Sequence, residues 1–207
     1  MTSTNAPTRD IMELLNILNP KEEVIPVGHS LGGYTALNLI NINDKINKAV
    51  IISGFVSIEN EMMTFMKSKM ISNIIKRFEK KLMPLYGNLN NLEYLKSTKE
   101  KILWFHSIDD PMVSYKYNAQ KVKELNNPSI KLITLENKKH NPEYTKEALD
   151  NMNEWLGEYY RKIRDKELNT IEEKKAYFSD KPIGQMTTQD KDIYDEIISF
   201  IENEGDE

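Results

Sequence analysis

The sequence predicts an α/β fold of about four parallel strands with flanking helices, a helical cap and a helical C-terminal extension. Short apolar runs alternate with longer segments of helical periodicity, in the order expected of βαβ units. No internal repeat is visible. The length of 207 residues is enough for one domain with a sizeable core.

Four short apolar runs are expected to form the strands. Continuous apolar runs of this length are typical of strands that are buried on both faces, as in a parallel sheet. Gly28 is expected to end the first strand. The runs lie at 24–27, 49–52, 102–105 and 130–135.

Helices are expected where apolar residues recur at spacings of three and four. Ser114 is expected to cap one of these helices, and Asn141 is expected to cap the longest, with Pro142 in its first turn. Thr187 or Thr188 is expected to cap the last. The predicted helices lie at 10–18, 31–42, 59–82 (as one or two helices), 114–125, 142–164 and 189–201.

The segment at 59–82 carries an apolar stripe at helical spacing. Such a Met-rich stripe is expected either to pack against the protein or to line a substrate pocket. Its members are Met62, Phe65, Met66, Met70, Ile74 and Phe78.

The charge pattern argues against nucleic acid and anionic lipid as partners. The chain has 28 Lys and Arg residues and 32 Asp and Glu residues, for a net charge of −4, and the two signs are interspersed. This pattern offers neither a basic patch for nucleic acid nor a polybasic segment for anionic lipid.

Cysteine is absent, which excludes disulfides, thiolate metal sites and cysteine nucleophiles. No apolar run approaches the roughly 20 residues that a membrane-spanning helix needs. The first nine residues are too polar for a signal peptide. We therefore expect a cytoplasmic protein without a transmembrane segment.

The segment from Gly28 to Gly32, with sequence GHSLG, matches G-x-S-x-G between an apolar run and an amphipathic helix. This is the context of a nucleophile elbow, in which a tight, strained turn presents the serine at the carboxyl end of a sheet. Ser30 is then the nucleophile, and the Leu31 N–H can donate to a developing oxyanion. Gly28 and Gly32 are expected because side chains there would collide across the turn. The alternative is a glycine-rich turn without catalysis.

A serine nucleophile needs a base, and the chain has three histidines. His29 lies inside the elbow and is expected to point away from the Ser30 hydroxyl. His106 ends the third run and is expected to support the loop that follows. His140, in the loop after the fourth run, is the predicted base. The alternative is that His140 is an exposed loop residue without a catalytic role.

The base needs a carboxylate to fix its tautomer and to stabilise its protonated form. The loop after the third run contains Asp109 and Asp110 ahead of Pro111. Asp110 is the predicted acid and Asp109 is the alternative. Both could instead be turn formers before the proline.

These three loops resemble those of the α/β-hydrolase superfamily, in which the triad follows the same chain order of Ser, Asp and His. The branch most similar is the bacterial one of serine aminopeptidases and monoacylglycerol lipases, over residues 10–161. The resemblance implies a core at 1–164 with a helical cap at about 57–98 that covers the site, followed by a charged helical extension at 165–207. It implies no cofactor and no metal.

The sequence departs from this family before the elbow. Family members carry about four strands there, and one of the missing loops donates the second oxyanion N–H. The first strand would then be an open edge, which normally needs protection. Three explanations remain open: the chain is a fragment, a second copy or partner chain covers the edge, or a reduced sheet folds alone with weak or no activity.

The resemblance and the triad pattern together imply a serine hydrolase. The expected reaction is cleavage of a small-molecule carboxylic ester or related acyl bond through an acyl-enzyme, as by an esterase or lipase. The alternative is a truncated, weakly active or inactive hydrolase-like module that needs a partner chain or acts in binding.

Overall fold

The computed structural model describes residues 3–87, 89–179 and 181–203. The chain forms two compact units. Unit 1 comprises Met1–Pro142 and Glu196–Glu207, and unit 2 comprises Glu143–Asp195. The division into 1–164 and 165–207 that the sequence suggested stays a prediction.

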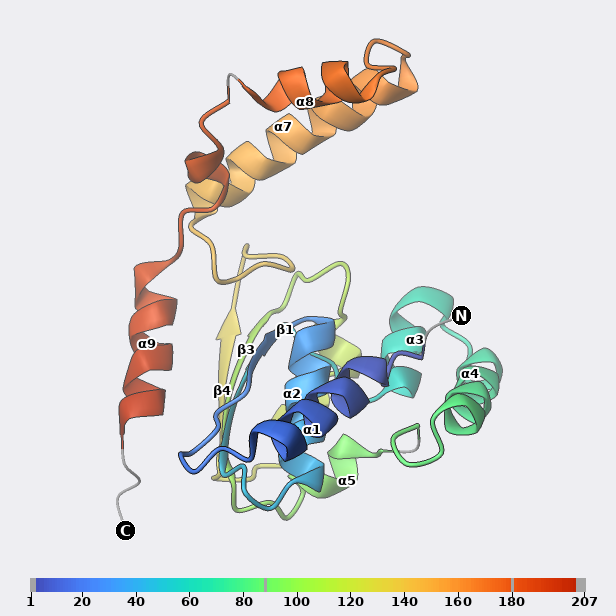
Figure 1. The fold of residues 1–207 in the computed structure, drawn as a ribbon, viewed down its shortest axis with the longest axis vertical. Coiled ribbons are helices and arrows are strands. Elements are labelled where there is room, and N and C mark those ends of the chain that lie inside the picture. Colours follow the sequence, from blue (N-terminus) through green and yellow to red (C-terminus); the bar gives the residue numbers. More distant parts are fainter. Residues whose placement is uncertain (1–2, 88, 180, 204–207) are drawn as a thin grey trace. The chain divides into compact units, whose positions relative to one another are not determined.

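Unit 1 is built on a sheet of four parallel strands in the order β1-β2-β3-β4. The prediction of four parallel strands with flanking helices is therefore confirmed (Figure 1). The strands are β1 (Val27–His29), β2 (Lys48–Ile52), β3 (Lys101–Ser107) and β4 (Ile130–Leu135).

The first strand lies later in the chain than predicted. β1 begins at Val27 and continues through Gly28, whereas residues 24–26 lie outside it. It pairs with β2 alone, with Val27 opposite Val50, and the Val27 side chain is 50% exposed. The prediction of a buried strand at 24–27 is wrong, because β1 is an edge strand with a solvent-facing side.

For one helix of unit 1, the periodicity of the sequence predicted both the first and the last residue. α2 spans Leu31–Ile42, as expected. α1 begins at Ala6, four residues earlier than predicted, because Pro7 suits the first turn of a helix. The others are α3 (Ile58–Met66), α4 (Lys69–Leu82), α5 (Asn91–Leu95), the 3₁₀ helix η1 (Tyr115–Tyr117), α6 (Ala119–Lys123) and the part of α9 (Lys191–Glu202) from Glu196 onward.

The helix predicted at 114–125 is interrupted at Asn118. The side chain of Asn118 is buried, accepts a hydrogen bond from the Val56 N–H at 3.2 Å and donates one to the Ser114 carbonyl at 3.2 Å. This residue lies outside the helical backbone region, at φ −122° and ψ −88°. The segment therefore divides into η1 and α6, and Ser114 does not cap it with its side chain.

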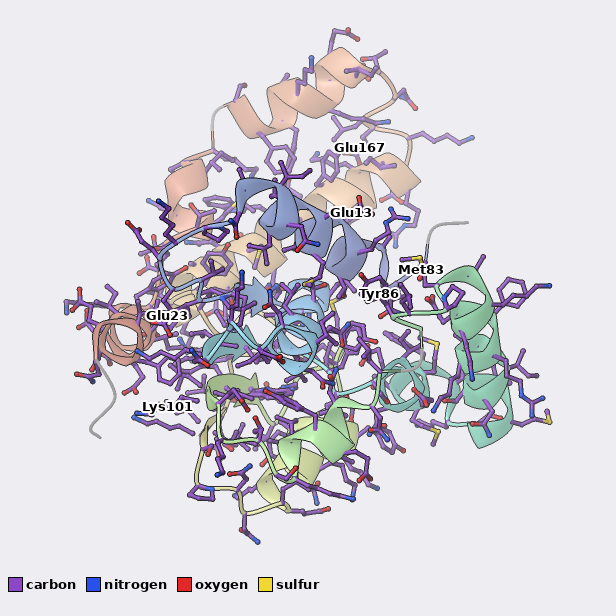
Figure 2. The ribbon with its side chains drawn as sticks, turned by 60° about the horizontal axis from the view of Figure 1, so that its bottom comes forward. Glu13, Glu23, Met83, Tyr86, Lys101 and Glu167 are labelled. Carbon is purple, nitrogen blue, oxygen red and sulfur yellow. The ribbon has the colours of Figure 1, made fainter. Side chains whose placement is uncertain are left out.

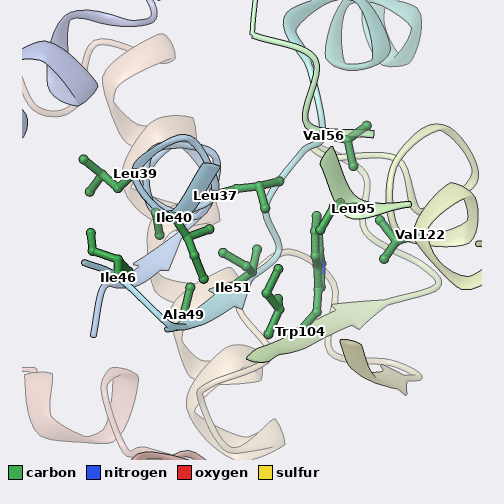
Figure 3. Packing of buried hydrophobic residues seen from close by; sticks show 12 residues of the cluster. Leu37, Leu39, Ile40, Ile46, Ala49, Ile51, Val56, Leu95, Trp104 and Val122 are labelled. Carbon is green, nitrogen blue, oxygen red and sulfur yellow. The ribbon is translucent and has the colours of Figure 1, made fainter. Parts of the chain in front are cut away.

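The hydrophobic core of unit 1 fills one face of the sheet. Trp104 of β3 is fully buried there, beside residues from α2, α5 and α6 (Figure 3). The core members are Ala36, Leu37, Leu39, Ile40, Ile46, Ala49, Ile51, Val56, Leu95, Ile102, Trp104 and Val122.

The opposite face of the sheet carries the last part of α9. Lys48 of β2 donates to the carbonyl groups of Ile201 and Asn203, at 3.3 and 2.8 Å. Lys131 of β4 forms an ion pair of 2.6 Å with Glu196. Figure 1 shows α2 and this last part of α9 on opposite sides of the strands.

Unit 2 consists of α7 (Lys146–Arg164), α8 (Ile171–Ser179), the 3₁₀ helix η2 (Ile183–Met186) and the first part of α9. The longest helix starts later than predicted, since Thr145 is its cap and accepts a hydrogen bond from the Ala148 N–H at 3.2 Å. Asn141 and Pro142 do not start it, because Tyr144 forms an isolated antiparallel bridge with Gln189.

The last helix is also capped by a different residue from those predicted. Asp190 accepts hydrogen bonds from the N–H groups of Asp192 and Ile193, at 3.1 and 3.4 Å. The Asp190 carboxylate therefore caps the first turn of α9, in place of the predicted Thr187 or Thr188. Within the described ranges, no helix is both long and apolar enough to cross a bilayer.

The apolar stripe of the segment at 59–82 is divided between α3 and α4 and faces outward. Five of its six members are exposed, and Met62 alone is partly buried, against a small cluster of Tyr34, Phe55, Ile58 and Val113. The interpretation of this stripe as internal packing is therefore wrong for most of its length. The exposed members are Phe65, Met66, Met70, Ile74 and Phe78.

Candidate active site

Ser30 occupies a sharp turn between β1 and α2. Its backbone has φ 56° and ψ −117°, a combination that costs free energy for any residue with a side chain. The Ser30 N–H donates to the Ile52 carbonyl at 2.8 Å, which anchors the turn to β2. Leu31 follows as the first residue of α2, where N–H groups have no partner within the helix.

The two glycines of the motif have different roles. A Cβ at Gly28 would lie 2.1 Å from the Gly32 carbonyl oxygen and 2.7 Å from the Gly33 nitrogen, so only glycine fits. A Cβ at Gly32 would meet nothing within 4 Å. The prediction that side chains at both positions would collide is therefore confirmed for Gly28 and wrong for Gly32. The backbone of Gly32 blocks a side chain at Gly28, whereas the space for a side chain at Gly32 is open.

Asp110 and His140 form a direct hydrogen bond. His140 Nδ1 lies 2.9 Å from Asp110 Oδ2, and the Asp110 side chain is fully buried. The other carboxylate oxygen, Oδ1, accepts from the N–H groups of Met112 and Val113, at 2.8 and 2.9 Å. Because a carboxylate accepts, the proton of this bond lies on His140 Nδ1, and Nε2 is left as the basic nitrogen.

Asp109 lies at the surface and does not take this position. Its carboxylate accepts a hydrogen bond from the Ser107 hydroxyl. Partial burial raises the pKa of Asp109, but the hydrogen bonds from Ser107 and from the backbone of Lys139 and Asn137 outweigh burial and lower it below the ordinary value. The structure thus brings Asp110 to His140 and uses Asp109 to support the loop that carries His140.

His29 connects the serine turn to the loop of His140. Its Nε2 lies 2.7 Å from the His140 carbonyl oxygen and therefore donates to it. The two imidazole rings are 4.7 Å apart, centre to centre. Since Ser30 is the next residue in the chain, this contact brings the serine turn and His140 to the same edge of the sheet.

His106 lies against the Asp110 carboxylate and binds the loop that carries it. It is fully buried, its Nε2 donates to the Val113 carbonyl at 2.8 Å, and the same nitrogen lies 3.6 Å from Asp110 Oδ2. Burial lowers the pKa of His106, although the bond to Val113 and the charge of Asp110 act in the opposite direction. A neutral ring with its proton on Nε2 agrees with these contacts.

The model of the prolyl oligopeptidase family matches residues 15–162, a range that includes Ser30, Asp110 and His140. The chain belongs to the prolyl oligopeptidase family. A comparison with curated protein sequences gave no match.

Solved structures similar to this member of the prolyl oligopeptidase family include esterases. An esterase of Pyrococcus furiosus is 17% identical with a TM-score of 0.50, over 80% of this chain and 64% of its own. The esterase domain of a Rhodothermus marinus protein is 16% identical with a TM-score of 0.47, over 64% of this chain and 58% of its own. An α/β-hydrolase from the sediment metagenome of the Mar Chica lagoon is 21% identical with a TM-score of 0.48, over 79% of this chain and 72% of its own.

These findings give the fold and the broad class of the chain. It has a partial α/β-hydrolase fold, as the resemblance implied, and belongs to a family of serine hydrolases. The chain spans 58% and 64% of the two named esterase structures. Among the residues that the structure describes, no group of three or more His, Asp or Glu side chains could hold a metal ion.

Glu61 is a residue near the site that the sequence did not reveal. It lies on α3, is 8% exposed, and accepts a weak hydrogen bond of 3.5 Å from the Asn118 amide. Burial and then the negative charge of Asp110 raise the pKa of Glu61 to about 7, although His140 and Asn118 act in the opposite direction. The only signal in the sequence is a glutamate on the apolar side of a predicted helix.

The two glycines provide a test of the turn. Gly28→Ala should destabilise the protein by about 2–4 kcal/mol, because the new methyl group meets backbone atoms that cannot move aside. Gly32→Ala should change the stability by less than about 1 kcal/mol, since its side is open and alanine favours the helix. Urea unfolding of both variants measures this difference, and equal losses would contradict the geometry.

Glu61 predicts a pH dependence of stability. Its pKa is 4.5 ordinarily and about 7 in the folded protein, so the folded state holds this proton more tightly. The free energy of unfolding should therefore lose at most about 3 kcal/mol through this residue as the pH rises from about 4.5 to about 7. Glu61→Gln should remove this loss.

Urea unfolding at about pH 5 and about pH 8 measures the effect. The stability of Glu61→Gln relative to the wild type should be more favourable at the higher pH. Glu93→Gln, at an exposed carboxyl, is the matched control and should show no such change. A difference that is the same at both pH values would show that the carboxyl of Glu61 is not perturbed.

Proposed function

We propose that this chain cleaves a carboxylic ester or a related acyl bond of a small molecule through an acyl-enzyme. Ser30 is the nucleophile, His140 the general base and acid, and Asp110 the residue that orients His140. The observation that supports this proposal most strongly is the 2.9 Å bond between the buried Asp110 and His140, beside a strained serine turn.

The chemistry follows from the protonation of His140. With the proton on Nδ1 held by Asp110, Nε2 takes the Ser30 hydroxyl proton as Oγ bonds to the acyl carbon. The Leu31 N–H, at the start of α2, donates to the oxyanion that forms. The leaving group receives the proton from Nε2 as its bond to the acyl carbon breaks.

Water completes the cycle. His140 Nε2 removes a proton from a water molecule, whose oxygen attacks the acyl carbon of the acyl-enzyme. The bond to Ser30 Oγ breaks, Oγ regains the proton from Nε2, and the carboxylic acid is released. Relatives of similar fold include esterases, and the family model is that of a peptidase family, so the acyl bond is proposed only as a class.

The alternative is a hydrolase-like module that is weakly active or inactive unless a second copy or a partner chain covers its open edge. β1 pairs with β2 alone, and a hollow of about 440 Å³ lies beside it. Its apolar lining includes Ile11, Val27 and Leu31. Exposed edges of this kind normally receive protection, and a single oxyanion donor would reduce the rate by roughly 10²–10³.

A fluorophosphonate probe tests the nucleophile. The wild-type protein should gain the mass of one adduct, located on Ser30, because the turn and His140 activate this hydroxyl. Ser30→Ala should not react, and Ser97→Ala, at an exposed serine, should react as the wild type does. Labelling that persists in Ser30→Ala would refute the proposal, and a wild type that never reacts would favour the inactive module.

The choice between the two aspartates is tested by the rate of the same reaction. Asp110→Asn should slow the labelling of Ser30 by about 10³–10⁴-fold, because an amide stabilises the wrong tautomer of His140. Asp109→Asn keeps an acceptor for Ser107 and should slow it by less than about tenfold. The reverse order of the two effects would assign the role to Asp109.

A further inference from the structure

α4 packs against the rest of unit 1 through two buried polar residues and through Ile75, which contacts a small apolar cluster. Ser72 and Glu79 are 3% and 7% exposed. The Glu79 carboxylate accepts hydrogen bonds from the Thr4 N–H at 3.0 Å, the Thr4 hydroxyl at 2.9 Å and the Asn5 amide at 3.2 Å. These bonds fix the rotation of the helix about its axis, so the residues that face outward are determined.

The outward side of α4 carries an unbroken apolar stripe. Its four residues are four positions apart in the sequence, so neighbours adjoin on the helix surface and together form one ridge that winds gradually around about 18 Å of helix. They are Met70, Ile74, Phe78 and Leu82, which are 71%, 53%, 54% and 42% exposed. Figure 2 shows α4 at the periphery of unit 1, with side chains on its solvent side.

Cationic side chains lie beside this stripe. Arg77, Lys80 and Lys81 are exposed on the same helix, whereas Lys76 is half-buried in an ion pair with Glu59. Glu79 is the only acidic residue of α4, and it faces inward. The solvent side of the helix is therefore positive, although the protein as a whole has a net charge of −4.

An exposed apolar stripe with cations beside it matches the boundary between lipid headgroups and acyl chains. Phe, Ile, Leu and Met side chains enter the apolar layer, while Lys and Arg attract anionic headgroups. Nucleic acid would use the cations but not the stripe, and an apolar protein groove would use the stripe but not the cations. We propose that α4 docks on an anionic lipid surface.

The charge pattern of the sequence did not indicate an anionic lipid partner, and α4 is where the fold changes that expectation. The sequence showed interspersed charges without a polybasic segment. The fold separates them, because it directs the one carboxylate of α4 inward and leaves three cations outward. The proposal does not depend on the hydrolase activity, since no residue of this surface belongs to the candidate active site.

Co-sedimentation of the full chain with vesicles tests the proposal. The wild type should bind phosphatidylcholine vesicles that contain about one third phosphatidylglycerol roughly tenfold or more tightly than pure phosphatidylcholine vesicles. Ile74→Ser/Phe78→Ser and Arg77→Gln/Lys80→Gln/Lys81→Gln should each weaken binding to the anionic vesicles by roughly tenfold or more. Thermal unfolding should show that both variants remain folded, because the substituted side chains are exposed.

Two matched variants control for general stickiness and net charge. Ile17→Ser/Leu18→Ser removes two exposed apolar side chains from α1, and Lys99→Gln/Lys101→Gln/Lys123→Gln removes three exposed cations elsewhere. Both should bind as the wild type does. Absence of wild-type binding, equal binding to neutral vesicles, or losses as large in the controls would overturn the proposal. Self-association of the wild type without vesicles that Ile74→Ser/Phe78→Ser abolishes would overturn it in favour of a protein partner.

Discussion

The hydrogen bond between Asp110 and His140 is the interaction on which the candidate site depends. β1 and β4 are the two opposite edges of the sheet, so the loop after β4 has to return along the carboxyl edge to reach the serine turn. Asp110, in the loop after β3, binds the side chain of His140 in this loop. His29, at the end of β1, binds the carbonyl group of the same residue. These two contacts hold the loop of His140, which follows one edge strand, beside the turn of Ser30, which follows the other.

The strained serine turn is held by contacts on each side of it. A residue with a side chain at φ 56° and ψ −117° costs on the order of 1–3 kcal/mol, and the surrounding structure must offset that cost. The bond from the Ser30 N–H to β2 and the start of α2 fix the turn from both ends. Gly28 allows the backbone of α2 to approach the strand, so the position of the hydroxyl follows from backbone geometry.

Two buried carboxyl groups near each other receive different environments. Asp110 accepts two backbone N–H groups in addition to His140, whereas Glu61 accepts one weak bond from Asn118. Burial, and after it the negative charge of Asp110, raises the pKa of Glu61, and the single weak bond from Asn118 does not offset this. Because Glu61 belongs to α3, which packs against α4, the electrostatics of the site are connected to the same helical pair whose outer side is apolar and cationic.

The sequence by itself determined the elements whose signals are local. The spacing of α2, the apolar runs of β2 to β4 and the G-x-S-x-G turn all depend on neighbouring residues, and these appear in the structure close to where they were predicted. Tertiary contacts decided the rest. The buried Asn118 divided a predicted helix, and a bridge at Tyr144 delayed the start of α7. The choice of Asp110 over its neighbour, the burial of Glu61 and the outward rotation of the α4 stripe all depend on residues distant in the chain, and no local pattern of spacing or propensity contains that information.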